Sequence, residues 1–202
     1  MAAASAPNPE ALDGRRLRSE RSRTAVVDAL LELHREGQLR PGASQIASRA
    51  GVSERSVFRH FEDLDTLVEE AIVRQWARVG PAFAPPDPTG TTDQRIAALA
   101  DQRLAIHDAV APTARAAMLL APDSYRLTET LARRRQLLDD QVAVHFATDL
   151  ATRGPRDRAE LTRALAAVAS FEHVEHLRAG VGLDPAATRR VVVRTLTALL
   201  AS

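Results

Sequence analysis

The hydrophobic positions of this chain recur with helical spacing almost throughout. Over residues 21–36 the apolar side chains fall three or four positions apart, and Gly37 marks the end of that run. No stretch alternates apolar and polar residues for long enough to predict a strand. The pattern therefore predicts an all-α protein. Further helices are expected over residues 44–50, 53–60, 63–79, 93–108, 112–120, 123–149 and 156–179, and from just after Pro185 to about residue 201.

Breaks in this pattern divide the chain. Residues 1–14 are rich in alanine and proline without periodicity, so we expect a disordered leader there. Residues 81–92 hold too many prolines for regular structure and are expected to link two helices. The short helices cluster before the long ones. We therefore expect a small three-helix domain at residues 15–65 and a larger helical domain at residues 66–202.

Composition narrows the class of protein. The 202 residues are 45% hydrophobic and 26% charged, which predicts a soluble folded protein, and the absence of cysteine excludes a disulfide framework or a thiolate metal site. No apolar run is long enough to span a membrane, and the first residues do not form a signal peptide, so a cytoplasmic protein is expected. Every basic residue is arginine, and residues 15–23 carry a net charge of +4. A basic segment at the front of a nearly neutral chain indicates nucleic acid.

The most informative stretch is residues 44–67, SQIASRAGVSERSVFRHFEDLDTL. Two short helices joined by a glycine turn form a helix-turn-helix. Ala47 is small where the helices would cross, Gly51 supplies a left-handed turn, and Val52 plugs the core between them. Ser53 is a good cap for the second helix. In this motif the second helix lies in the major groove of DNA, and its first residues read base edges.

This stretch resembles the TetR/AcrR family of bacterial transcriptional regulators. The positions in register are Arg23, Ala29, Ile46, Ala47, Ala50, Gly51, Val52, Ser53, Val57, Phe58, Phe61 and Leu67. Beyond residue 80 the likeness is limited to helix lengths and a few features. The resemblance implies an N-terminal helix-turn-helix domain and a C-terminal domain for effector binding and dimerisation. It also implies a homodimeric repressor whose partners are a palindromic double-stranded DNA operator and a small organic effector that releases the repressor from DNA. No cofactor is implied.

The chain also departs from the family pattern. Arg55 and Ser56 stand where the family has a small residue followed by threonine, and Phe58 replaces a tyrosine whose hydroxyl reaches phosphate. Leu64 stands where a lysine is common, and Gly42 replaces a hydroxyl cap. Replacement phosphate contacts are expected from Arg55, from two further residues of the second helix and from the basic arm at residues 15–23.

Candidate DNA contacts follow from the motif's register. Arg55 lies where a side chain can pair with guanine, and the alternative is a solvated surface arginine. Phe58 is expected in the core, although it can also meet a thymine methyl, and His60 is either a phosphate contact or a solvent-exposed histidine. The full set of candidates is Ser44, Ser53, Glu54, Arg55, Ser56, Phe58, Arg59 and His60.

Two further sets of residues are expected in the larger domain. The first would line an effector pocket, where Arg103 and His107, one helical turn apart, can together hold a carboxylate or phenolate. Its members are Trp76, Arg103, His107, Met118 and Tyr125. The second is an apolar stripe on the last long helices that would form a four-helix bundle between two subunits. Its members are Leu161, Leu165, Val168, Val192, Leu196 and Leu199.

Metal and catalytic sites are not predicted. The string from Glu172 to His176 lacks the spacing of known two-histidine motifs, and a pair on one helix face explains it better than a metal site. No nucleophile, base or phosphate-binding loop forms a catalytic set, so an enzyme is not expected. Two alternatives stay open: a DNA-architectural dimer without an effector, and a small all-α enzyme.

Overall fold

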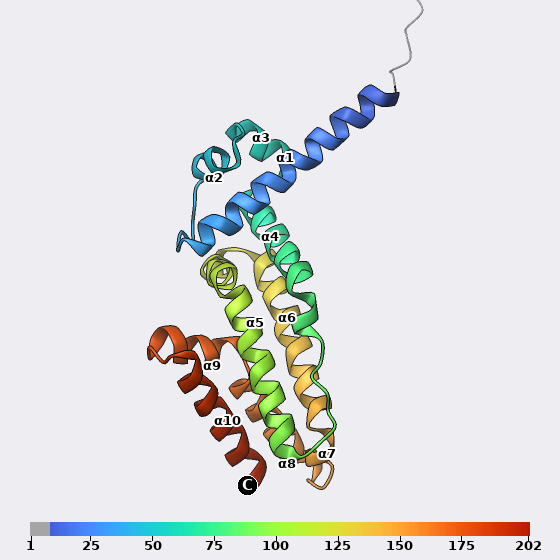
Figure 1. Ribbon diagram of the computed structural model, residues 1–202, viewed down its shortest axis with the longest axis vertical. Coiled ribbons are helices and arrows are strands. Elements are labelled where there is room, and N and C mark those ends of the chain that lie inside the picture. The colour runs from blue at the N-terminus through green and yellow to red at the C-terminus, as the bar shows by residue number, and fades with distance from the viewer. Residues whose placement is uncertain (1–8) are drawn as a thin grey trace, which may run out of the picture. The chain divides into compact units, whose positions relative to one another are not determined.

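The computed structural model describes residues 9–202, and the side chains from Arg16 onward. All regular structure within these residues is helical (Figure 1). The first half contains α1 (Pro9–Arg35), α2 (Ala43–Ala50), α3 (Glu54–His60), α4 (Leu64–Val79), the 3₁₀ turn η1 (Gly80–Phe83) and α5 (Thr92–Leu120). The second half contains the 3₁₀ turn η2 (Ala121–Asp123), α6 (Tyr125–His145), α7 (Ala147–Leu150), α8 (Pro155–Val168), α9 (Phe171–Glu175), the π-helical turn η3 (His176–Gly180) and α10 (Pro185–Ala201).

The first helix begins earlier than its hydrophobic pattern indicates. Helix α1 begins at Pro9, so the expected disordered leader is wrong for residues 9–14, while residues 1–8 lie outside the described residues. Proline is tolerated in the first turn of a helix, where its missing N–H has no partner to lose. The alanine, leucine, arginine and glutamate that follow are good helix formers, which explains a helix without an apolar face.

Helix boundaries also differ further along the chain. Helix α5 runs through Pro112, although that residue was expected to begin a new helix. A proline removes one backbone hydrogen bond from a helix, but the surrounding turns continue it here. The expected helix over residues 156–179 is divided, because Ser170 caps α9 by accepting a hydrogen bond from the backbone N–H of His173 at 3.1 Å. The capping hydroxyl competes with continuation of the helix.

The chain forms two compact units. Unit 1 contains the residues up to Arg74 together with Pro112–Leu127, and unit 2 contains Gln75–Ala111 and Thr128–Ser202. The sequence pattern predicts a boundary after residue 65, whereas the first unit continues to Arg74 and includes a second segment. The first part of α4, the end of α5, the turn after it and the start of α6 thus belong to the same compact unit as the helix-turn-helix.

The core of unit 1 is built on α1. Helices α2 and α3 both pack against it, as Figure 1 shows. Their inner faces and that of α4 bury apolar side chains completely, and burial of this kind is the main favourable term in folding. The core side chains from these four helices include Val26, Val27, Leu30, Leu31, Ile46, Val57, Phe61, Leu67 and Ile72.

Unit 2 has a separate hydrophobic core. Its members come from α5, α6, α7, α8, α9 and α10, and α8 packs directly against α10. Its most completely buried side chains include Ile96, Leu99, Phe146, Leu165, Val192 and Leu196. At one end of this core the buried Arg95 of α5 pairs with Asp149 of α7, with an Nη2 to Oδ1 distance of 2.6 Å. The hydroxyl of Thr92 donates to the same carboxylate at 2.7 Å. This polar cluster ties the start of α5 to α7.

Candidate nucleic-acid interface

The turn between α2 and α3 has the geometry that its sequence predicts. Gly51 ends α2 in the left-handed region with φ of 66°, where its N–H bonds the carbonyls of the last turn. A residue with a β-carbon is disfavoured in this conformation, so glycine is required by the backbone. At the other end of α2, Gly42 provides no capping side chain. Instead its backbone N–H donates to Oε1 of Gln45 at 2.9 Å.

Ser53 caps α3 as expected. Its hydroxyl accepts a hydrogen bond from the backbone N–H of Ser56 at 3.2 Å, and the two serine hydroxyls lie 3.0 Å apart. These contacts fix the start of α3 and the direction in which its side chains point. Ser44 and Glu54, two further candidates for DNA contact, are exposed at the first turns of α2 and α3.

Helix α3 presents a cationic and aromatic face to solvent. Val57 is buried, while Arg55 and Arg59 are exposed and form no hydrogen bond or ion pair with any residue that the structure describes. Phe58 is 51% exposed, so its expected place in the core is wrong. Its position one residue after Val57 turns it about 100° around the helix axis, away from the buried side, whereas Phe61 is buried. An exposed aromatic ring between two free guanidinium groups suits contact with DNA.

His60 is held differently from its neighbours. Its Nε2 atom is buried without a hydrogen-bond partner among the described residues. Burial lowers the pKa of His60, and the positive charges of Arg59 and Arg23 lower it further. The ring is therefore neutral at pH 7, which suits packing at the end of α3 better than an ionic contact with phosphate.

Arg23 connects three parts of unit 1. Its Nη1 donates to the carbonyl of His60 at 2.6 Å, its Nε donates to Glu70 at 3.1 Å, and its guanidinium lies 4.4 Å from the centre of the Phe61 ring. A cation at the C-terminus of a helix is favoured by the helix dipole. The sequence pattern places Arg23 in a basic arm at residues 15–23, but in the structure its side chain bonds α1 to α3 and α4. The local sequence does not show this role, because the partners His60 and Glu70 lie far from Arg23 along the chain.

The five residues expected to line an effector pocket do not form one set. Met118 and Tyr125 belong to unit 1, where Tyr125 is 81% exposed, and a side chain so open to solvent does not line a pocket within that unit. Trp76, Arg103 and His107 belong to unit 2. The structure thus divides the five candidates between the two units, and their role in effector binding stays a prediction.

The three residues in unit 2 have defined partners. The indole of Trp76 stacks on Phe83 with 3.9 Å between ring centroids. Arg103 is 4% exposed and donates to the side chains of Gln102 and Gln141 and to the carbonyl of Leu138.

His107 is also buried, but it does not share a partner with Arg103 as expected. Its Nε2 lies 2.7 Å from a carboxylate oxygen of Glu175, and its ring stacks on Phe171 with 5.0 Å between centroids. The contact joins α5 to α9 within unit 2. His107 therefore has a carboxylate partner inside the protein, which makes it a poor receptor for a second carboxylate.

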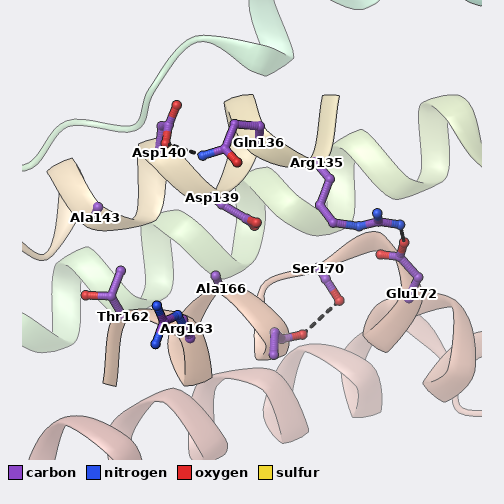
Figure 2. A pocket seen from close by; sticks show the side chains of 11 residues that line it. Arg135, Gln136, Asp139, Asp140, Ala143, Thr162, Arg163, Ala166, Ser170 and Glu172 are labelled. Atoms are coloured by element: carbon purple, nitrogen blue, oxygen red, sulfur yellow. Dashed lines mark hydrogen bonds and ion pairs between the residues drawn. The ribbon is translucent and has the colours of Figure 1, made fainter. Parts of the chain in front are cut away.

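A groove of about 680 Å³ lies between α6 and the segment from α8 to α9 (Figure 2). None of the expected effector residues lines it. Figure 2 shows alanine side chains on its walls and the Arg135–Glu172 ion pair at one end. The other lining residues are Gln136, Asp139, Asp140, Ala143, Thr162, Arg163, Ala166, Ala167 and Ser170. Burial raises the pKa of Asp139 above its ordinary value, although Arg135 and Arg103 oppose this effect.

The stripe expected to join two subunits is mostly internal. Leu165, Val192 and Leu196 have no exposed surface within a single subunit, and Leu161 is also buried. They pack in the core of unit 2, where Val168 and Leu199 are partly buried against them. These six positions were selected by their apolar spacing, which identifies the face of a helix that is covered but not what covers it.

The string from Glu172 to His176 takes part in two separate contacts. Glu172 pairs with Arg135, and Glu175 meets His107. The structure divides the string between α9 and the π-helical turn that begins at His176. No group of three or more histidine or acidic residues able to hold a metal ion occurs among the residues with described positions.

The structure defines an all-α, helix-turn-helix protein. More particularly, the chain has the fold of TetR-family transcriptional regulators. It superposes on a tetR-family transcriptional regulator from Streptomyces coelicolor with a TM-score of 0.70 and 22% identity, covering 90% of this chain and 81% of that one. A transcriptional regulator from Rhodococcus sp. Rha1 gives a TM-score of 0.68 at 17% identity, covering 91% of this chain and 96% of that one.

A third solved structure agrees with this assignment of the fold. It is described as a putative TetR-family transcriptional regulator from Mesorhizobium loti, and it gives a TM-score of 0.60 at 17% identity, covering 91% of this chain and 97% of that one. No family model and no curated protein sequence matches the chain. Within the described residues, no helix is both long enough and apolar enough to cross a lipid bilayer.

Proposed function

We propose that this protein is a transcriptional regulator that binds a double-stranded DNA operator through α3. The observation that carries the proposal is the division of α3 into two sides. Val57 is buried, whereas Arg55, Phe58 and Arg59 face solvent. The two guanidinium groups have no hydrogen-bond or ion-pair partner among the described residues. Guanidinium groups can pair with guanine or phosphate, and an aromatic edge can contact a thymine methyl. The likeness of the fold to transcriptional regulators supports the same interpretation.

The proposed regulator acts as a homodimer in the cytoplasm. One subunit offers one reading helix, and a single half-site gives little affinity or specificity. Two-fold symmetry would place two copies of α3 in successive major grooves, about 34 Å apart, and would require a palindromic operator. Ligand responsiveness completes the proposal: a small organic effector binds within unit 2 and lowers the affinity for operator DNA, so that the protein is a repressor released by its effector.

The experiment that tests DNA recognition selects bound fragments from the source genome and then measures Arg55→Ala. We expect this variant to lose about 1–3 kcal/mol of binding to the selected operator, the energy of a specific contact with a base. Random DNA should be affected much less. Arg21→Ala, in the exposed basic arm, should weaken binding to both DNAs alike and reduce the dependence of affinity on salt.

The matched control is Arg156→Ala, which removes an exposed arginine of unit 2 and should change neither affinity. Equal losses on operator and random DNA for Arg55→Ala would mean that Arg55 contacts phosphate only. If no genomic fragment is selected above background, the proposed function is wrong.

A further inference from the structure

Arg103 is a buried cation without an acidic partner. Its Nη1 donates to Oε1 of Gln102 at 2.9 Å and to Oε1 of Gln141 at 3.1 Å, and its Nη2 donates to the carbonyl of Leu138 at 2.7 Å. All three acceptors are neutral. Its Nε is buried and has no hydrogen-bond partner, and Arg103 forms no ion pair with any described residue. The side chain is therefore fixed in place, but no acidic side chain forms an ion pair with it among the described residues.

A second arginine of unit 2 shares this property. The guanidinium of Arg134 on α6 lies 4.2 Å from the ring centre of Trp76, which in turn stacks on Phe83. Arg134 is partly buried, and it forms neither a hydrogen bond nor an ion pair with the part of the chain that the structure describes. A cation over an indole ring gains some stabilisation, but the ring carries no net negative charge.

The two arginines belong to one network of contacts. Leu138, whose carbonyl accepts from Arg103, lies one helical turn after Arg134 on α6. Gln141 accepts from Arg103 and also donates to the carbonyl of Phe83 at 2.8 Å. Phe83 then stacks on Trp76, which faces Arg134. The network joins both guanidinium groups to one aromatic pair within unit 2.

Burial makes these charges unfavourable. Loss of hydration lowers the pKa of Arg103 to about 10, although the charge of Asp139 opposes the effect, and it lowers the pKa of Arg134 to about 9. Elsewhere in the same unit the protein avoids this cost, because the equally buried Arg95 has the carboxylate of Asp149 at 2.6 Å. A buried charge is normally paired, so two unpaired arginines in one network are a specific feature of this site.

We infer that unit 2 binds an organic carboxylate whose negative charge is received by Arg103 and Arg134 and whose apolar part contacts the Trp76–Phe83 pair. The inference rests on the proposed function, since it names the chemical class of the effector. Arginine forks match the planar geometry of a carboxylate, and charge-assisted hydrogen bonds of this kind are strong. The aromatic pair favours an apolar body over a small inorganic anion.

Thermal unfolding of the full chain without DNA tests the inference. The probes are benzoate, 1-naphthoate and decanoate, each compared with its neutral amide, and with sodium chloride and inorganic phosphate at the same ionic strength. At least one carboxylate should raise the melting temperature of the wild-type protein, while its amide and the salts should not. Arg103→Gln and Arg134→Gln should each weaken carboxylate binding about tenfold or more, the effect of one lost charge-assisted hydrogen bond.

The melting temperature without ligand distinguishes a ligand-binding role of Arg103 and Arg134 from a purely structural one. Without ligand, both variants should melt at or above the wild-type temperature, because each removes a charge that is removed from solvent and has no acidic partner among the described residues. Arg163→Gln is the matched control. It removes an exposed arginine that has no ion-pair partner among the described residues and that lines the groove between α6 and the segment from α8 to α9, and it should leave carboxylate binding unchanged. If carboxylate binding is lost in this control but retained in the other two variants, the ligand occupies the groove and the inference is wrong.

Three further outcomes also overturn the inference. These are failure of every carboxylate to stabilise the wild-type protein, equal stabilisation by inorganic phosphate, and melting of both ligand-free variants well below the wild type. Operator binding by the wild type is measured separately. DNA binding without carboxylate binding would contradict this inference and leave the proposed function intact. Carboxylate binding without DNA binding would contradict the proposed function and leave the carboxylate site intact.

Discussion

Single side chains in unit 1 are held in states that their residue type does not predict. His34 is the clearest case, because it is 1% exposed and both ring nitrogens lack hydrogen-bond partners among the described residues. Burial lowers its pKa from 6.5 to about 4. The neutral imidazole of His34 is therefore buried in unit 1 as an apolar side chain would be. Charging this imidazole is therefore opposed by its burial.

This histidine should make stability depend on pH. Its pKa is lower in the folded than in the unfolded chain, so the unfolded state binds the proton first as the pH falls. The stability present above pH 6.5 is then lost progressively as the pH falls towards 4. The loss from His34 should reach about 2 kcal/mol at pH 5 and approach about 3 kcal/mol at lower pH.

Urea unfolding of the wild type and of His34→Leu at pH 7 and pH 5 measures this contribution. We expect the variant to lose less stability between the two pH values by about 2 kcal/mol. His176→Gln, at an exposed histidine, is the control and should keep the pH dependence of the wild type. The same pH dependence in His34→Leu and the wild type would show that His34 is accessible to protons in the folded protein.

Elements of unit 2 are joined by polar contacts as well as by the apolar core. The Arg95–Asp149 pair connects α5 with α7, and His145 bonds the carbonyl of Arg95 at 2.8 Å. Burial alone would raise the pKa of Asp149, but hydrogen bonds from Arg95 and Thr92 outweigh it and leave the pKa lowered. The carboxylate is thus favoured in its charged form.

Asp149→Ala should therefore destabilise unit 2 markedly. Removing one partner leaves the Arg95 charge buried and unpaired, which costs about 3 kcal/mol or more. Chemical denaturation followed by circular dichroism measures the change. Glu160→Ala breaks the exposed Arg156–Glu160 pair on α8 and should cost little, because solvent screens such pairs. Equal effects of the two substitutions would mean that the buried pair contributes no more than a surface pair.

At the scale of the whole molecule, the proposed dimer needs a surface that is free in each subunit. The apolar stripe selected from sequence does not provide it, because Leu196 and Val192 are fully buried in one subunit. Val191 of α10 is 36% exposed, and Ala167 of α8 is also exposed. Since α8 and α10 pack against each other, these outward positions are the better candidates for contact with a second copy.

We expect Val191→Glu to reduce dimer formation while leaving each subunit folded. A charge at an exposed position is tolerated by the monomer but opposed at an apolar contact between subunits. Leu196→Glu, by contrast, should unfold unit 2. Sedimentation velocity reports the oligomeric state, and circular dichroism reports the fold. A dimer of unchanged stability in Val191→Glu would place the interface on another surface.

The sequence predicts the helical class, the helix-turn-helix and its caps because these depend on local spacing. Gly51 and Ser53 are examples, since each acts on residues within the same turn. The sequence does not predict partners that lie far apart along the chain. Arg23 meets Glu70, and Arg134 meets Trp76, through packing that no local pattern encodes. Hydrophobicity alone also does not show whether Phe58 is buried, because its exposure depends on which side of α3 the other helices cover.

The stack of Arg134, Trp76 and Phe83 gives the protein an internal optical reporter. Trp76 is the only tryptophan in the chain, and Tyr125 is the only tyrosine. The indole lies in unit 2 between a guanidinium and a phenyl ring, whereas the phenol lies in unit 1, open to solvent. Selective excitation of the indole therefore follows the surroundings of Arg134 without a label. Any event that moves this cation changes the emission spectrum, while the phenol reports separately on the unit that carries α3.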